Sequence, residues 1–417
     1  MIARSASSVA AGRLSVPRFA VLFLLMACSM PSPTLAQESS ARFTVAGTGL
    51  VSLDLNRTTA LESGVGDTDQ GVVTNFSDSF LLLRLDRQLY TNHRAGMLLG
   101  FLFPDAETDL GDVFYNQINV FYDTRTFRGT LGRTRLENFA LEFPTLREED
   151  LLEYAFVLNG FSNADNSEFN RYGNVARAEL FGLGGRLHVR GQASNWSVTD
   201  IEGERQNDFD VNTGSGFLGY QLPHSIRYSG IVREAGVGFQ SQKVDLAGGK
   251  WLVGLSAGLA VNLSRNPLRN IELRGQVIHN RGVGPNARVD AAAGTLATPM
   301  GRALSRSTAL VASLRFLRRP YQLDRLQAAA TVGYKTFSGV DASQLTLVPN
   351  VFFQLGQGVD VGVQYQYESF SGNLAELLGR RRSHSVKFVL VFSFQSMFND
   401  YFGDRDDILN LEHGYIS

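Results

Sequence analysis

Few side chains in this sequence have the types and spacing that enzyme chemistry requires. The six histidines, at positions 93, 188, 224, 279, 384 and 413, lack the short spacings typical of zinc ligands. Gly248-Gly249-Lys250 is followed by Trp251 instead of Ser or Thr, and the rest of a phosphate-binding loop is missing. The only cysteine, Cys28, lies in the N-terminal leader considered below. We therefore expect no enzyme activity, no metal site and no other cofactor.

Charged side chains instead recur at alternate positions of apolar segments, where they share one face. The basic residues of this face are Arg84, Arg128, Arg177, Arg186, Arg190, Arg274, Arg315 and Lys335. Its acids and one histidine are Asp86, Glu179, His188, Glu272, Asp360 and Glu368. Any one of these charged residues, taken alone, is explained by the hydration of a polar surface. The whole set indicates the lining of an aqueous channel, where opposed charges orient dipolar solutes and set ion preference.

The elements that carry these charges alternate between apolar and polar residues with a period of two. From Val359 to Tyr367, for example, valines and tyrosines alternate with Asp360, Gly362, Gln364 and Gln366. Such alternation is typical of a strand with one apolar and one polar face. We predict sixteen strands, near 43–55, 79–90, 95–103, 114–123, 127–136, 175–182, 186–196, 213–222, 227–240, 251–263, 271–280, 305–317, 325–337, 345–354, 359–370 and 384–394.

The links between these segments alternate in length. Every second link is short, as at 91–94, 124–126 and 183–185, whereas most of the others are long, such as 137–174 and 281–304. Short turns at one end, long loops at the other and strands of about 9–13 residues are typical of an outer-membrane β-barrel. The fold class we predict is all-β, a transmembrane antiparallel up-and-down barrel of about sixteen strands.

A soluble β-sandwich or propeller is the alternative, because its strands also alternate. Strand length, loop asymmetry and an export signal together favour the membrane barrel. Pro349 lies inside a predicted strand and lacks a backbone donor, so we expect the pairing there to be bulged or shifted.

Composition narrows the class further. The 417 residues are 19% charged and 44% hydrophobic, which excludes a disordered chain. After residue 30 no apolar run reaches the roughly 18 residues of a spanning helix. The net charge of −1 gives no basic face for a nucleic acid, so no nucleic-acid partner is expected.

The first 36 residues have the features of a secretory signal peptide. Arg4, Arg13 and Arg18 precede the apolar stretch 19–27, and Thr34-Leu35-Ala36 forms a small-residue cleavage site. Leu25-Met26-Ala27-Cys28 also resembles a lipobox, which would make Cys28 a lipidated N-terminus. We expect residues 37–394 to form the barrel and residues 395–417 a periplasmic C-terminal tail.

In strand number, strand parity and the place of its longest link, the sequence from about 40 to 394 resembles the sixteen-stranded porins of Gram-negative outer membranes. In that family the third extracellular loop follows strand five and folds into the pore. The resemblance implies the same for the link 137–174, which also shows a helix-like apolar stripe near 146–158. Its acids would line a constriction: Glu142, Glu148, Glu149, Asp150 and Glu153. A solvated acidic loop on the cell surface is the alternative.

The expected function is a passive outer-membrane channel for small hydrophilic solutes and ions. A substrate-selective channel for anions or sugars, with Arg177, Arg186 and Arg190 as a basic track, is the alternative. A lipid hydrolase embedded in the barrel wall is the third reading, although His188 lies on the polar face and not toward lipid. Expected partners are outer-membrane lipid, small solutes and two further copies in a homotrimer. Porins commonly end on an aromatic residue, whereas this chain ends in Ser417, so Phe394 would serve that role internally.

Overall fold

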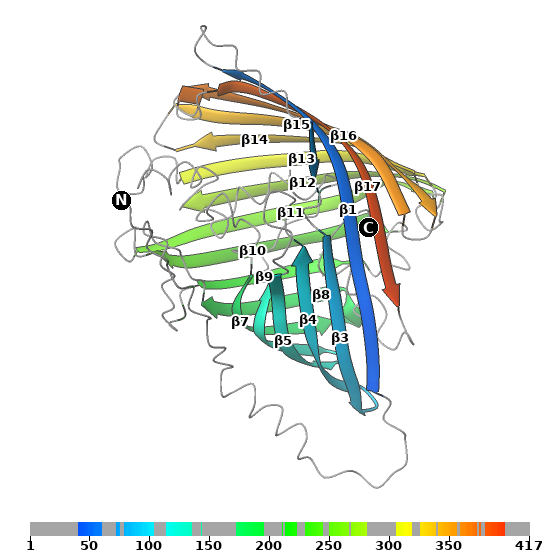
Figure 1. Cartoon of the computed structure of the whole chain (residues 1–417). Helices are drawn as coiled ribbons and strands as arrows, with labels where there is room; N and C mark the ends of the chain where they lie inside the picture. The colour runs from blue at the N-terminus through cyan, green and yellow to red at the C-terminus, as the bar shows by residue number, and fades with distance from the viewer. Residues whose placement is uncertain are drawn as a thin grey trace, which may run out of the picture. The chain divides into compact units, whose positions relative to one another are not determined.

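The computed structural model of the chain is a single antiparallel sheet within the compact unit Ser40–Ser417 (Figure 1). The structure describes residues 41–60, 72–75, 79–103, 114–135, 143, 172–195, 211, 213–222, 230–244, 250–266, 268–281, 306–318, 326–338, 341–356, 359–372, 375–376 and 380–396. Among these residues no helix is both long and apolar enough to cross a bilayer.

Seventeen strands make up the described sheet. Their bounds are β1 (Ala41–Ala60), β2 (Val72–Asn75), β3 (Ser79–Tyr90), β4 (His93–Phe103), β5 (Phe114–Thr124), β6 (Phe127–Arg135), β7 (Tyr172–Gly182), β8 (Leu187–Asn195), β9 (Thr213–Gln221), β10 (Val232–Val244), β11 (Lys250–Asn266), β12 (Arg269–Arg281), β13 (Arg306–Arg318), β14 (Leu326–Phe337), β15 (Ala342–Gly356), β16 (Val359–Gly372) and β17 (Arg380–Ser396). A 3-10 turn, η6 (Leu183–Gly185), joins β7 to β8.

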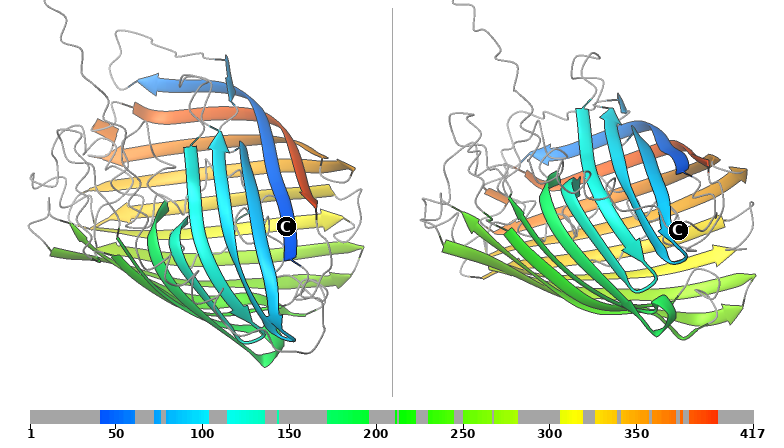
Figure 2. Two further views of the ribbon diagram at one scale, coloured as in Figure 1. Left: turned by 60° about the horizontal axis from the view of Figure 1, so that its bottom comes forward. Right: turned by 90° about the horizontal axis from the view of Figure 1, so that it is seen from below.

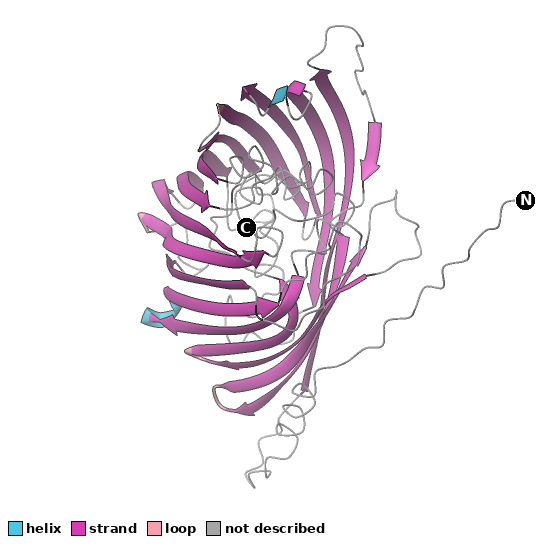
Figure 3. Cartoon of the chain, turned by 90° about the vertical axis from the view of Figure 1, so that its left-hand side faces the viewer, coloured by secondary structure: helices cyan, strands magenta, loops and turns pink. Residues whose placement is uncertain are grey.

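The strand pairings form a ring. Each strand from β3 to β17 pairs with the next in antiparallel fashion, and β1 pairs with both β17 and β3, so the ladder returns to its start. The short strand β2 pairs only with β1, over Ser52–Leu55, which leaves sixteen strands in the wall. Figures 2 and 3 show how these strands curve around a common interior.

The alternation of each strand places polar side chains inside the ring and apolar side chains outside. In β13, Ser313 and Arg315 are 2% and 3% exposed, whereas the intervening Leu314 is 52% exposed. Arg233 of β10 forms an ion pair with Glu272 of β12, and these two strands are separated by β11. Side chains that meet across an intervening strand project into the concave side of a curved sheet. The buried polar face is therefore the inner one. This arrangement reverses the usual preference for buried apolar side chains and suits a wall that faces lipid.

The sixteen predicted strands correspond one to one with the sixteen wall strands, so the predicted up-and-down barrel class is confirmed. Some boundaries of the prediction were wrong. β2 lies inside a segment predicted as a link, and β10 begins at Val232, not at residue 227. Gly230 and Ile231 instead form a bend.

Pro349 interrupts the pairing on one side only. The register of β15 with β14 continues through the proline, where Ala330 lies opposite Pro349. The register with β16 passes from Leu347–Tyr367 directly to Asn350–Gln364. The pairing is thus broken over two positions but not shifted, because proline cannot donate to the ladder and the strand resumes in phase.

The predicted ends of the chain fall largely outside the described residues. The signal peptide 1–36 lies entirely outside them, as does the tail from residue 397 onward. β17 continues to Ser396, two residues beyond the predicted end of the barrel. Phe394 lies in β17 opposite Gly47 of β1.

Candidate functional site: the inner wall

The inner face of the wall holds most of the charged side chains that the sequence singled out. Among the described residues, nine basic and five acidic side chains are less than one-tenth exposed there. The basic ones are Arg84, Arg94, Arg128, Arg190, Arg233, Arg274, Arg315, Lys335 and Lys387. The acidic ones are Asp86, Asp123, Glu179, Glu272 and Asp360. The inner wall that the structure describes therefore has more positive than negative side chains.

The first group on this wall, the Asp86 cluster, joins four neighbouring strands, β3 to β6, through five residues: Arg84, Asp86, Arg94, Asp123 and Arg128. Asp86 Oδ1 lies 3.4 Å from Arg84 Nε, and Asp86 Oδ2 lies 3.2 Å from Arg94 Nη1. Asp123 Oδ2 lies 3.7 Å from Arg94 Nη2 and accepts a hydrogen bond of 2.8 Å from Arg128 Nη2. Arg94 thus bridges the two aspartates.

The second group, the Glu272 cluster, gathers three arginines around one carboxylate. Arg233 of β10 and Arg274 of β12 donate to Glu272, and Arg315 Nη2 of β13 donates to Glu272 Oε2 at 3.1 Å. All four side chains are at most 3% exposed. Charge-assisted hydrogen bonds of this kind are stronger than neutral ones and hold the guanidinium planes in place.

The two clusters lie on opposing parts of the ring. Three strands, β7 to β9, separate β6 from β10 on one side. Five strands, β14 to β17 and β1, separate β13 from β3 on the other. Each cluster includes three arginines. Both clusters hold more arginines than carboxylates, so together they create a positive potential in the interior that acts on any ion entering it.

A third group centres on His188 of β8, near the short-turn end of the wall. His188 Nε2 lies 2.9 Å from Glu179 Oε1. The imidazole ring stacks on Phe181, with 4.6 Å between centroids, and meets Phe217 edge-on at the same distance. The Arg190 guanidinium lies 4.2 Å from the centroid of Phe217.

The three residues predicted as a basic track differ in burial and in local structure. Arg177 of β7 is half-buried and donates a hydrogen bond of 3.1 Å to Gln192 Oε1, whereas Arg190 is buried. Arg186 was expected at the start of a strand. The structure places it as the residue that ends η6, in a helical conformation and exposed. β8 begins at Leu187, one residue later than predicted, because Leu183-Gly184-Gly185 folds as a turn with positive φ at each residue.

The remaining residues of the predicted lining lie on β14 and β16. Lys335 of β14 is buried, with Nζ 5.3 Å from the centroid of Phe337. Glu368 Oε1 of β16 accepts a hydrogen bond of 3.2 Å from Gln344 Nε2. Asp360 is buried on the same strand. The predicted acids of the long loop, Glu142, Glu148, Glu149, Asp150 and Glu153, lie outside the described residues, as does the predicted helix 146–158.

Sequence reasoning missed four inner-wall charges: Arg94, Asp123, Arg233 and Lys387. Arg94 was assigned to a turn, although β4 begins at His93. Arg233 lies at a register shift between Val232 and Glu234, where alternation no longer tells which face a side chain takes. Asp123 and Lys387 could have been assigned to the inner face from the sequence, because both follow the alternation of their strands.

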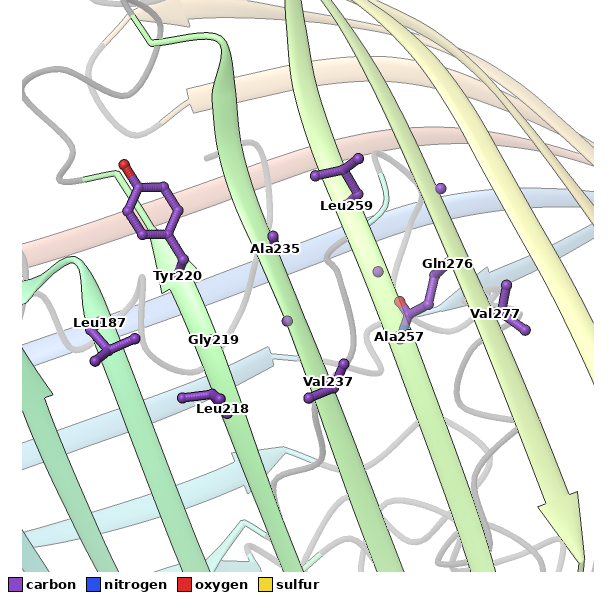
Figure 4. Close-up of a pocket in the computed structure, with 13 residues that line it drawn as sticks. Leu187, Leu218, Gly219, Tyr220, Ala235, Val237, Ala257, Leu259, Gln276 and Val277 are labelled. Atoms are coloured by element: carbon purple, nitrogen blue, oxygen red, sulfur yellow. The ribbon is translucent and has the colours of Figure 1, made fainter.

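The outer face is apolar. Over β8 to β12 it forms a depression of about 620 Å³, whose lining includes Ala235, Val237 and Ala257 (Figure 4). Leu187, Leu218 and Tyr220 are among the larger side chains around it. This depression lies on the opposite side of the wall from the charged clusters. It is a feature of the surface that would face lipid, not of the inner site.

No group of three or more His, Cys, Asp or Glu residues suited to a metal ion occurs in the part of the chain that the structure describes. The charged side chains of the inner wall can attract and orient small ions.

No protein-family model matches the chain, and no curated protein matches it in sequence. Solved structures do match. OmpF of Salmonella typhi, in complex with daunomycin, superposes with a TM-score of 0.57 at 10% identity, over 85% of this chain and 98% of that one. The outer-membrane channel DcaP of Acinetobacter baumannii gives 0.54 at 11% identity, over 86% and 99%. An anion-selective porin from Comamonas acidovorans gives 0.54 at 12% identity, over 85% and 100%.

These matches cover nearly the whole of each solved chain. The protein is thus an antiparallel up-and-down β-barrel. Its fold is that of the sixteen-stranded outer-membrane porins.

Proposed function

We propose that this protein is an outer-membrane porin, a passive diffusion channel for small hydrophilic solutes and ions. The observation that carries the proposal is the reversed distribution of side chains. Charged and amide side chains line the inner face, whereas leucines, valines and phenylalanines about half exposed cover the outer face. A wall with an apolar outside and a polar inside suits a lipid bilayer around an aqueous interior. A ring of sixteen strands is large enough to hold a water-filled channel.

The proposal is tested by solute entry into vesicles. The refolded chain is inserted into liposomes, which are diluted into isotonic solutions of sugars of increasing size. Swelling that falls smoothly with solute size supports a passive channel. A folded barrel that admits no solute contradicts it.

A selective anion channel is the second candidate function. The excess of basic over acidic buried side chains on the described inner wall favours it. Current that rises linearly with ion concentration supports the passive porin. Current that saturates, and is blocked by one anion or sugar, supports the selective channel.

We also propose that the link 137–174, apart from its last three residues, which begin β7, enters the barrel as an acidic constriction. Its acids would then face the inner arginines. Deleting 146–158 should raise conductance and admit larger sugars in the swelling assay. A correctly folded deletion variant with unchanged conductance would place the loop outside the channel.

The remaining parts of the proposal concern the setting of the barrel. Residues 1–36 are proposed to direct export and to be removed, and residues 395–417, apart from the first two, which end β17, are proposed to form a periplasmic tail. We propose that the protein lies in a bacterial outer membrane, contacts its lipid, assembles as a homotrimer and has no catalytic role. Cross-linking in native membranes tests the trimer, since three linked copies are expected as the largest product.

A further inference from the structure

The hairpin of β12 and β13 has an unusual pair of residues at each end. At the short-turn end Arg269 lies directly opposite Arg318, and at the long-loop end Arg281 lies directly opposite Arg306. All four side chains are exposed. This one hairpin therefore contains two pairs of directly opposed arginines, one pair at each end.

These arginines point out of the barrel. In β12 the buried residues have even numbers, from Asn270 to Ile278, so Arg269 and Arg281 share the outer face. In β13 the buried residues have odd numbers, so Arg306 and Arg318 are also on the outer face. None of the four forms an ion pair with an acid among the described residues.

Like charges directly opposite each other destabilise a sheet, because their side chains stand only about 5 Å apart. An anion placed between two guanidinium groups removes the repulsion. Phosphate suits the position, since each arginine can donate two parallel hydrogen bonds to its oxygens.

The spacing of the two pairs fits the thickness of a membrane. Arg269 and Arg281 are twelve residues apart in one strand, a length of about 40 Å at the usual rise. A tilt of about 45° reduces the height to about 28 Å, close to the apolar band of about 25 Å on outer-membrane barrels. Between the pairs the outer face presents Ile271, Leu273 and Val277 from β12, which are 37–45% exposed.

We propose that each arginine pair binds the phosphate of a lipid headgroup, one pair in each leaflet. This inference rests on the membrane position proposed above. The bound species is a phospholipid and not free phosphate, because the apolar band that joins the two pairs would hold its acyl chains.

The test uses the refolded full chain in detergent, titrated with phosphatidylglycerol and observed by native mass spectrometry. Replacing Arg281 and Arg306 with Gln, or Arg269 and Arg318 with Gln, should each weaken lipid binding at least about tenfold, since two basic side chains at the membrane level are lost. The control variant, R125Q with R381Q, removes two exposed arginines that lie opposite no other arginine in the strand pairings, and it should bind as the wild type does.

Two further measurements are added. The first distinguishes a loss of lipid binding from misfolding, and the second distinguishes a lipid phosphate from free phosphate. The single change Arg281→Glu turns a repulsive pair into an attractive one. It should fold at least as well as the wild type and yet lose lipid. A phosphate-free galactolipid should bind weakly to every variant, and inorganic phosphate at the lipid concentration should not displace phosphatidylglycerol.

The inference is overturned if both double variants bind phosphatidylglycerol with an affinity within twofold of the control variant. It is also overturned if the wild type binds the galactolipid as tightly as phosphatidylglycerol. Displacement by inorganic phosphate would show a plain anion site and overturn the lipid assignment. Channel conductance is measured on the same samples. If the wild type conducts and the pairs bind no lipid, this inference alone fails. If the wild type neither inserts nor conducts, the proposed function fails with it.

Discussion

Glu272→Gln is the change that tests the inner-wall electrostatics most sharply. The side chain keeps its size, but the carboxylate that three arginines share becomes neutral. A unit charge acts on an ion about 8 Å away in water with about 0.5 kcal/mol. That energy is roughly a twofold change in the local concentration of each ion, up for anions and down for cations. The two changes multiply, so the ratio of chloride to potassium permeability should rise about fourfold.

The assay is the reversal potential of the refolded channel under a tenfold KCl gradient. The shift should be largest at low salt, because the Debye length at 0.01 M is about 30 Å. Asp341→Asn is the matched control, since it removes one exposed carboxylate at the start of β15 and should leave the potential nearly unchanged. Unfolding in urea should show a loss of up to about 3–5 kcal/mol for E272Q, the usual range when one partner of a buried pair is removed. A folded E272Q channel with wild-type selectivity would refute the idea that this cluster faces the conducting path.

Other substitutions test the strand register and the backbone geometry of the barrel wall. Val363→Arg, on the outer face at 37% exposure, should cost about 2–4 kcal/mol in a folding titration into lipid if it lies at the midplane, whereas Gln364→Arg on the inner face should be mild. Equal tolerance would show that the register of β16 is wrong. Gly132→Ala should destabilise the barrel in the same titration, because its φ is +127° and a Cβ would lie 2.5 Å from the Ile118 carbonyl oxygen. A Gly132→Ala barrel as stable as the wild type would contradict that geometry.

The strands could be predicted from the sequence because each one alternates over nine residues or more, and a membrane wall enforces that period on both faces. The inner charges of β13 and β14, Arg315 and Lys335, lie in uninterrupted alternation and could be assigned by parity. Arg233 could not, because the register shift beside it reverses parity within one residue.

The Glu272 cluster could not be predicted either. Arg233 and Arg315 lie 39 and 43 residues from Glu272 along the chain, and only Arg274 is close to it in sequence. Arg315 of β13 lies directly opposite Glu272 of β12, which requires the register, whereas Arg233 of β10 reaches the same carboxylate across β11 because the sheet is curved. The opposed arginines at both ends of the β12–β13 hairpin needed the register itself, since a slip of one residue would have placed them on different faces.

The most direct measurement of the central claim is the single-channel current of the purified, refolded chain in a planar bilayer. A porin barrel predicts discrete upward current steps of uniform size in KCl, proportional to voltage and to salt concentration. A barrel shown to be folded and inserted that gives no steps would contradict the account.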